Sequence, residues 1–391
     1  MSKLITNTIR HTGASSDAIT LASDGTATAK ITNNLSNRNL IINGAMQVAQ
    51  RATSSTDGNY KTLDRWKHNH GGTDENPTYA QIDLDSSDTG PWAKGFRKAF
   101  KFTNGNQTSG AGADDYVQVM QAIEAQNIAQ SGWDYTSSSS YITISFWIKS
   151  SVAQAFAGHL RTADGTSKSY SFSTGSLSAN TWTKVTKTIP GASGLQFDNN
   201  AAAGLYFYIF AFMGTNLTST FTTESWANAS STNYANDMTS TWWTTNDATL
   251  AITGVQLEVG DTATDFEHRS YGDELLRCQR YFWQATKIGS TSDVSNKPVC
   301  PGNYISSSEV RFLIDFPVTM RAQPTHTSND NNGSWYFNHG SADMFDRFDM
   351  YSATEQRAIL RNSAHMSGTA GNAGMAYQET GDSSLSFSAE L

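Results

Sequence analysis

The sequence predicts a mainly β protein whose largest part is an antiparallel jelly-roll β-sandwich. Three observations support this fold class. Aromatic residues, which strands favour, make up 11% of the 391 residues. Charged residues make up only 16%, against about 25% in an average soluble protein. Apolar runs with strand periodicity recur between residues 39 and 267, separated by turns rich in Gly, Ser and Asn.

Charge and hydropathy exclude several classes of partner. The formal net charge is −8, and no block of Lys and Arg could neutralise phosphates, so we expect neither nucleic acid nor an anionic membrane surface as a partner. No apolar run of about 18 residues occurs, which argues against membrane insertion. The N-terminal residues also lack the apolar core of a signal peptide. We therefore expect a soluble protein that is not secreted by the general route.

The first 38 residues form a segment of their own. Two short strand-like runs, "AITLA" and "TATAKIT", flank "SDG", whose Asp-Gly pair is a hairpin signal. A lone hairpin is marginally stable in water, so this one must pack on copies of itself or on another protein. Residues 1–38 are thus predicted to be an attachment and oligomerisation segment.

Two runs inside the predicted sandwich, residues 39–267, show how its strands face the core. "YITISFWIK" (141–149) alternates, with Ile142, Ile144, Phe146 and Ile148 on one face. "GLYFYIFAFMG" (204–214) is apolar on both faces: Leu205, Phe207, Ile209 and Met213 share one, and Tyr206, Tyr208, Phe210 and Phe212 share the other. The second face needs cover from a loop or from a neighbouring subunit.

Two further segments depart from simple alternation. In "TLAITGVQLEVG" the apolar phase slips by one residue at Gly254, which predicts a β-bulge there. "DYVQVMQAIEAQNIA" (115–129) is the one helical candidate in the sandwich region, although its Val, Met and Ile spacing is ambiguous.

The period changes to that of a helix after Phe266. Ser270 and Asp273 form a capping-box pattern, and an apolar stripe follows at Tyr271, Leu275, Cys278 and Phe282. Residues 268–283 are therefore predicted to be a short connector helix beginning near Tyr271. In 284–391, Val310, Phe312, Ile314 and Phe316 alternate, as do Leu385, Phe387 and Leu391, which predicts a smaller C-terminal β domain.

Several blocks distributed over most of the chain are distinctive. They are "NLIINGAMQVAQR" (39–51), "YKTLDRW" (60–66), "ITGVQLEVGDTATDFEHRSYGDELLRCQRYF" (252–282), "FPVTMRAQPT" (316–325), "LSFSAEL" at the end and "ITNTIRHTGASSDAITLASDG" near the start. Together they resemble tail-fibre and related appendage proteins of marine tailed bacteriophages of the cyanophage-like type.

This resemblance implies a carbohydrate-binding-module-like jelly roll in a homotrimeric virion appendage. Such a protein is made in the host cytoplasm, joins tail or other virion proteins through its N-terminal segment, and contacts host cell-surface polysaccharide without catalysis. Modules of this type often hold a structural calcium near their first and last strands, for which Asn43, Glu258 and Glu267 are the candidate ligands here. Ordinary carboxylates without metal are the alternative.

Candidate glycan-binding residues follow from the chemistry of sugars, which stack on aromatic rings and hydrogen-bond to polar side chains. The run "SWANASSTNYANDMTSTWWTTN" (225–246) carries Trp226, Tyr234, Trp242 and Trp243, and Trp92 in "GPWAKGFRK" is a second candidate. The alternative is that these rings pack against the sandwich or a neighbouring subunit. Trp66 and Trp147 lie in a family-like block and in mid-strand, and we expect both to be structural.

The sequence offers little support for an enzyme. No nucleophile elbow, phosphate-binding loop or metalloprotease motif occurs, and no spacing defines a pair of catalytic carboxylates. Cys278 and Cys300 are the only cysteines, so a disulfide framework is excluded, although one bridge between them stays possible. The leading hypothesis is a phage tail-fibre subunit that binds host glycan. The alternatives are a purely structural head, collar or tail appendage and, less favoured, a glycan-degrading tailspike.

Overall fold

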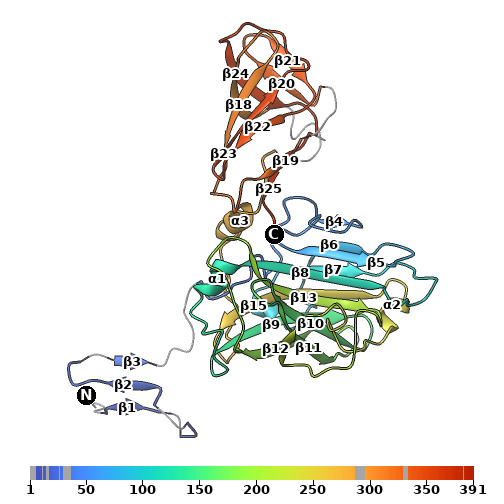
Figure 1. The fold of residues 1–391 in the computed structure, drawn as a ribbon, viewed down its shortest axis with the longest axis vertical. Coiled ribbons are helices and arrows are strands. Elements are labelled where there is room, and N and C mark those ends of the chain that lie inside the picture. The colour runs from blue at the N-terminus through green and yellow to red at the C-terminus, as the bar shows by residue number, and fades with distance from the viewer. Residues whose placement is uncertain are drawn as a thin grey trace.

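The computed structural model describes residues 6–10, 12–14, 17–25, 27–29, 37–286, 296–328, 333–381 and 383–391. Figure 1 shows a small N-terminal sheet, a large β-sandwich and a C-terminal β domain that projects from one side of the sandwich. The N-terminal sheet contains β1 (Thr8–Ile9), β2 (Ile19–Leu21) and β3 (Ala27–Ala29). β2 and β3 pair antiparallel, which confirms the predicted hairpin within the described residues.

Two six-stranded antiparallel sheets face each other in the sandwich, as the predicted fold class requires. The first, which we call sheet A, has the order β14 (Trp226–Asn228), β11 (Lys168–Ser176), β10 (Ala155–Thr162), β13 (Ala203–Met213), β8 (Tyr116–Glu124), β5 (Lys67–Gly71). The second, sheet B, has the order β12 (Thr183–Pro190), β9 (Tyr141–Ser150), β15 (Thr249–Val259), β7 (Lys98–Thr103), β6 (Thr78–Asp83), β4 (Ser54–Ser55). Short helical segments η1 (Trp92–Lys94), α1 (Ala125–Ala129) and α2 (Thr241–Thr244) lie in the connections.

The core between the sheets is formed by the residues that alternate inward. The predicted inward face of β9 is fully buried at Ile142, Ile144, Phe146 and Ile148. The bulge predicted in β15 is present, because the register to β9 shifts between Thr253 and Gln256 and Gly254 has a φ of +63°. Glycine adopts such a left-handed backbone conformation more readily than any other residue. The bulge returns the apolar side chains that follow it to the core.

The end of β13 differs from the prediction. Phe212 packs in the core between the sheets, whereas Met213 packs on the outer face of sheet A, the reverse of the expected assignment. A register shift against β8 between Phe210 and Phe212 exchanges the two faces. As expected, the outer face is covered in part by a loop, through Leu217 and Tyr234.

Residues 115–129 are mainly a strand, so the helical prediction is wrong for most of the segment. β8 pairs along its length with β13 on one side and β5 on the other, and these tertiary partners override the ambiguous spacing of its apolar residues. Only the five residues of α1 are helical.

The predicted connector helix is α3 (Tyr271–Gln279), and Ser270 caps it by accepting a hydrogen bond from the backbone N–H of Asp273. Its buried stripe matches the prediction at Cys278 and Phe282, with Leu275 half-buried, and departs from it only at Tyr271. Cys278 is buried, but Tyr271 is 56% exposed and Glu274 takes its place, accepting a hydrogen bond from the backbone N–H of Asn43. A charged residue thus fixes the helix to the first segment of the sandwich.

The C-terminal domain contains two antiparallel sheets. The smaller one has the order β16 (Phe282–Gln284), β25 (Leu385–Ser388), β19 (Thr325–Ser328). The larger has the order β21 (Ala342–Phe345), β20 (Trp335–Asn338), β24 (Ala373–Gln378), β17 (Lys297–Tyr304), β18 (Val310–Asp315), β23 (Arg357–Asn362), β22 (Asp349–Ala353). Val310, Phe312, Ile314, Leu385 and Phe387 meet in one core, as their alternation predicts.

Two expectations about the C-terminal domain need correction. Leu391 does not join Leu385 and Phe387, because it packs on the outer face of sheet A in the sandwich. Cys278 and Cys300 are both buried and free, so the possible bridge between them is not formed. The predicted domain boundaries at residues 38, 267 and 283 stay predictions.

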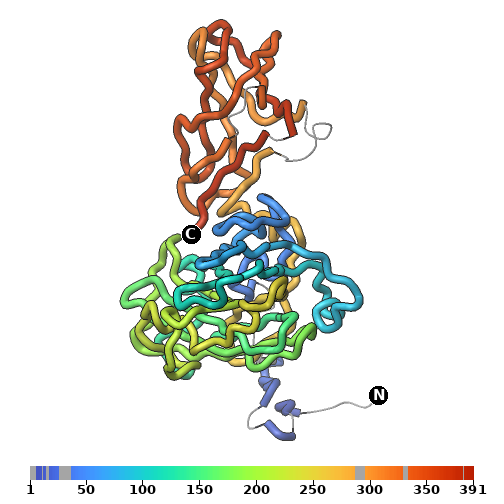
Figure 2. Tube along the Cα trace, turned by 90° about the vertical axis from the view of Figure 1, so that its right-hand side faces the viewer, coloured from blue at the N-terminus to red at the C-terminus, as the bar shows by residue number. Residues whose placement is uncertain are grey.

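A buried ionic clamp joins the C-terminal domain to the sandwich. Glu390 pairs with Arg65, and its other carboxylate oxygen lies 3.1 Å from Nη2 of Arg51. The Arg65 side chain is only 1% exposed, and its guanidinium lies 3.4 Å from the ring centroid of Tyr281. A second link is Glu124, which accepts two hydrogen bonds from Arg280, each 2.8 Å long. Figure 2 shows that the C-terminus of the chain lies where the C-terminal domain meets the sandwich.

We expect Glu390→Gln to lower the free energy of unfolding by about 3 kcal/mol, because it leaves the buried Arg65 guanidinium without a compensating charge. Urea unfolding followed by circular dichroism measures this loss. Glu355→Gln is the matched control, since Glu355 is exposed and forms no side-chain ion pair within the described residues. Equal stability of the two variants would contradict the importance of the clamp.

Candidate functional site

The outer face of sheet A carries a groove with an aromatic floor. Tyr206 and Tyr208 point outward from β13, and their ring centroids are 6.1 Å apart. Across the strands, Tyr206 pairs with Arg161 of β10, and Tyr208 pairs with Met120 of β8. The groove has a volume of about 470 Å³ and is lined by Lys67, Met120, Arg161, Thr162, Ala163, Ser167, Tyr206, Tyr208 and Leu391.

Two cations border this floor, and neither forms an ion pair within the described part of the chain. Arg161 donates from Nε to the hydroxyl of Ser167 at 3.1 Å, while its two terminal nitrogens donate to no described residue. Lys67 lies with its ammonium 5.9 Å from the ring centroid of Tyr60. Burial raises the pKa of Tyr208, so its phenol keeps a proton to donate. The groove therefore offers stacking surface together with hydrogen-bond donors.

The end of the chain closes one side of the groove. Leu391 lines it, and the hydroxyl of Tyr60 donates to the carbonyl oxygen of Leu391 at 2.9 Å. The neighbouring Glu390 is held by Arg65 and Arg51 in the clamp described above. The clamp thus positions a wall of the groove as well as the C-terminal domain.

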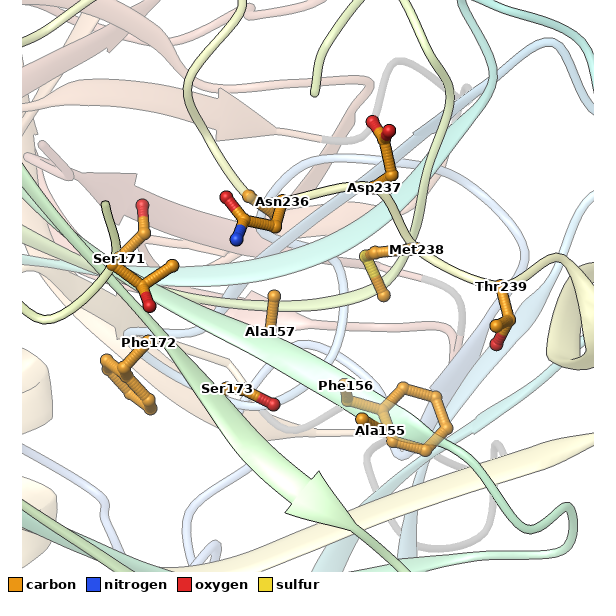
Figure 3. A pocket seen from close by; sticks show the side chains of 12 residues that line it. Ala155, Phe156, Ala157, Ser171, Phe172, Ser173, Asn236, Asp237, Met238 and Thr239 are labelled. Atoms are coloured by element: carbon orange, nitrogen blue, oxygen red, sulfur yellow. The ribbon is translucent and has the colours of Figure 1, made fainter. Parts of the chain in front are cut away.

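A smaller pocket lies farther along the same face, beneath the loop that follows β14 (Figure 3). Its volume is about 170 Å³. Met238 points into it toward Phe156, whereas the carboxylate of Asp237 points away and accepts a hydrogen bond from Thr218. Ala157 of β10 forms part of the floor. The pocket is mostly apolar and lacks the charged groups of the groove.

Tyr234 covers His159 between the pocket and the groove. Ala157, His159 and Arg161 follow one another on the outer face of β10, and the ring of Tyr234 lies 5.5 Å from that of His159. The Ser171 hydroxyl donates to the carbonyl of Tyr234 and so accepts from Nδ1 of His159 at 2.7 Å. Nε2 of His159 is buried without a partner. Burial lowers the pKa of His159 to about 3, which keeps the imidazole neutral.

The structure does not support Trp242 and Trp243 as glycan-binding residues. Both side chains are fully buried in the core between the sheets. Nε1 of Trp243 donates to the carbonyl of Gly110, and the ring lies 5.0 Å from Phe212. A ring without exposed surface cannot stack on a sugar, so the packing alternative is correct for this pair.

The other predicted aromatics are half-buried and do not come together. Trp226 donates to the carbonyl of Pro190 and packs beside Tyr170 at 5.4 Å. Tyr234 forms the cover over His159. Trp92 lies on the sheet B side, where the guanidinium of Arg97 covers its ring at 3.6 Å. None of these predicted residues lines the groove.

The candidate calcium ligands do not fit a metal site. Asn43 accepts from the backbone N–H of Val48, and Glu258 accepts from the backbone N–H and the hydroxyl of Thr264. Glu267 accepts from Asn39 and Arg269. Their oxygens thus serve protein donors, and within the described ranges no group of three or more His, Cys, Asp or Glu side chains is arranged around a common centre. The structure thus gives no support to a calcium site at these three residues, and the calcium hypothesis stays a prediction.

Sequence reasoning missed the groove residues Tyr206, Tyr208 and Arg161 as a site. The available signal was the second apolar face of β13, which required an explanation. We expected a cover over the whole face, whereas the loop covers only the end near Phe210. At the other end Tyr206 is half-buried and Tyr208 is 8% exposed, and both line the groove.

Comparisons with known proteins identify no family for this chain. No protein-family model matches it, and no curated protein matches it. Within the described residues, no helix is long and apolar enough to span a membrane.

Solved structures match part of the chain at low similarity. The enzymatically active domain of tailspike protein 4 from bacteriophage CBA120 is 12% identical over 56% of this chain, with a TM-score of 0.30, and the match covers 21% of that domain. A putative sugar-binding protein from Bacteroides thetaiotaomicron is 11% identical over 56% of this chain and 99% of its own length, with a TM-score of 0.29. A family 11 carbohydrate-binding module from Clostridium thermocellum is 12% identical over 55% of this chain and 98% of its own length, with a TM-score of 0.26. Similarity at this level assigns no function.

Acidification should destabilise the protein through His159. The unfolded histidine has a pKa of about 6.5, so between pH 7 and pH 5 it binds a proton that the folded state, with a pKa of about 3, excludes. The contribution of His159 to the free energy of unfolding is therefore fully present above the unfolded pKa and is lost as the pH decreases. At pH 5 this loss amounts to about 2 kcal/mol.

His159→Asn tests this expectation, because asparagine keeps a donor toward Ser171 but cannot titrate. Urea unfolding gives the free energy of unfolding at pH 7 and at pH 5. Its decrease between these pH values should be about 2 kcal/mol smaller in the variant than in the unmodified protein. His68, with a pKa lowered by burial to about 4, and Asp64, with a pKa raised by burial to about 6, contribute equally in both proteins. Identical pH dependence would refute the assignment to His159.

Proposed function

We propose that the protein binds glycans in the groove on the outer face of sheet A, as a non-catalytic adhesin. The observation that carries this proposal is the row of Tyr206 and Tyr208 beside two cations without carboxylate partners in the described chain. Pyranose rings present C–H faces that stack on aromatic rings, and their hydroxyls accept from cationic donors. The groove volume of about 470 Å³ lies in the range of small-ligand sites.

The charge of the groove favours glycans that contain acidic units. Among its lining side chains, Lys67 and Arg161 are cationic and none is Asp or Glu, while the terminal carboxylate of Leu391 at one edge accepts a hydrogen bond from Tyr60. A carboxylate or sulfate on the sugar would complete the hydrogen bonding of the Arg161 guanidinium, which is suited to planar anions. The chain as a whole has a formal net charge of −8, so this local positive charge is a distinct feature of the groove.

The same lining supports a binding role without hydrolysis. Glycoside hydrolysis generally uses two carboxyl groups on either side of the scissile bond, and the described side chains of the groove supply none. We therefore propose that the protein is not an enzyme. Release of reducing ends from a bound polysaccharide would favour the tailspike alternative.

We further propose that the chain is a homotrimeric phage tail-fibre subunit located in the virion. The sequence blocks that resemble marine phage appendage proteins support this role, and residues 1–38 are the proposed attachment segment to tail or other virion proteins. Several copies on one particle would multiply weak glycan contacts. Light scattering should give three times the mass of the 42.5 kDa chain, and a stable monomer at micromolar concentration would contradict the trimer.

A purely structural head, collar or tail appendage is the second candidate. The clamped C-terminal domain and the covered end of sheet A are compatible with a passive part. Binding of the assembled protein to host polysaccharide separates the two candidates, because a passive part has no reason to retain an open aromatic floor.

We expect Tyr206→Ala to weaken polysaccharide binding about tenfold, because it removes the more exposed of the two tyrosine rings that line the groove. Affinity electrophoresis of the full chain against a panel of bacterial surface polysaccharides measures the change. Tyr271→Ala is the control, since Tyr271 is 56% exposed on α3, outside the groove. The proposal is wrong if no acidic or neutral polysaccharide slows the migration of the unmodified protein, or if the two variants bind with equal affinity.

A further inference from the structure

A second hollow lies on the opposite side of the sandwich, on the outer face of sheet B. It has a volume of about 300 Å³, at the lower end of the range for small-ligand sites. Strands β9, β12 and β15 form its floor, and the segments around η1 and after β15 form its walls. The lining residues are Ala93, Lys94, Phe96, Ser145, Trp147, Lys184, Gly254, Thr264, Asp265, Phe266 and His268.

The β-bulge shapes one wall of this hollow, which we call the Trp147 pocket. A Cβ atom on Gly254 would lie 2.5 Å from the ring of Phe96, so only glycine lets that ring rest on the bulged backbone. Phe266 packs edge-on against Phe96 at 4.9 Å, and His268 lies 5.1 Å from the same ring. The wall is therefore a fixed aromatic cluster.

Trp147 and Lys184 form the other side. They are directly opposed across β9 and β12, so both side chains lie on the same face of sheet B, and both line the hollow. Trp147 is half-buried, and its N–H donates to no described residue. Gly90 lies against the six-membered ring of this indole, where an added Cβ would come within 2.7 Å of it. The half-buried indole also lines the hollow.

The charges of the pocket leave one cation uncompensated. Lys94 lies 3.5 Å from the carboxylate of Asp265, and its carbonyl oxygen is within 2.8 Å of Nε2 of His268. The Lys184 side chain is exposed, and its ammonium group forms no ion pair or hydrogen bond with any other described residue. Such a pocket combines an aromatic face, hydrogen-bonding groups and a single positive charge.

We propose that the Trp147 pocket is a second saccharide site, which takes one acidic sugar unit. The pyranose ring stacks on Trp147, and the carboxylate of the sugar meets the ammonium group of Lys184. The pocket volume suits a short unit rather than a long chain. The site corrects the expectation that Trp147 has only a structural role.

This site is independent of the groove. The groove lies on the outer face of sheet A and the pocket on the outer face of sheet B, with the core between the sheets separating them. One chain could then hold two glycan strands on opposite faces, which increases avidity for a polysaccharide layer. The pocket retains its ligand whether or not the groove binds glycan.

Ligand-observed NMR titration of the full chain tests the proposal with galacturonate and its uncharged methyl ester. We expect millimolar binding of galacturonate and at least fivefold weaker binding of the ester. Lys184→Gln should weaken galacturonate binding at least fivefold and leave the ester unchanged. Lys101→Gln is the matched control, because it removes the same charge from the same sheet face outside the pocket.

Further variants separate this site from the groove. Trp147→Leu should remove binding of both ligands to the pocket, while Tyr206→Ala should leave galacturonate binding to the pocket intact. Lys184 is exposed, so Lys184→Gln is expected to fold, and circular dichroism checks this. Unchanged galacturonate affinity in folded Lys184→Gln, or binding lost only in Tyr206→Ala, would overturn the proposal. If instead the proposal for the groove is wrong, the protein would bind no polysaccharide there but would still bind galacturonate in the Trp147 pocket.

Discussion

The carboxylate of Glu390 is the constraint on which the arrangement of the molecule depends. It lies beside the buried guanidinium of Arg65 and that of Arg51, so a residue at the end of the chain compensates charge that the sandwich has already buried. An arginine that is 1% exposed is costly unless it is paired, so the sandwich and the last strand of the C-terminal domain stabilise each other. The same contact brings Leu391 to the groove, which connects the stability of the junction with the shape of the candidate site.

The two outer faces of the sandwich are used differently. On sheet A, the loop after β14 covers one end, and His159 stays neutral beneath Tyr234, while the other end remains open around Tyr206. On sheet B, a bulge at a single glycine creates the space in which Phe96 and Trp147 face a hollow. Aromatic residues are abundant in this chain. The candidate sites differ from the other aromatic clusters because loops leave part of the sheet face uncovered there.

Local sequence patterns predicted the strands well wherever one periodicity dominated. The alternation in β9, the bulge at Gly254 and the capped start of α3 were all readable, because each depends on neighbours in sequence. Residues 115–129 were misassigned because their partners, β13 and β5, lie far away in sequence. The prediction of the site residues was wrong for a related reason. Tertiary contacts bury Trp242 and leave Tyr206 at the groove, and residue type alone does not encode these contacts. Leu391 in the groove could not be predicted at all from alternation with Leu385 and Phe387.

The chain crosses between the sandwich and the C-terminal domain twice, and the two crossings are bonded to each other. Phe282 enters the domain directly opposite Ser388, which leaves it, because β16 and β25 are neighbouring strands of the smaller, three-stranded sheet. A single connecting strand could rotate about its backbone bonds, whereas two strands joined in a sheet resist rotation because it would break the hydrogen bonds between them. Viscous drag on the projecting domain would therefore turn the whole sandwich with it, and the orientation of the groove relative to that domain would persist as the protein moves.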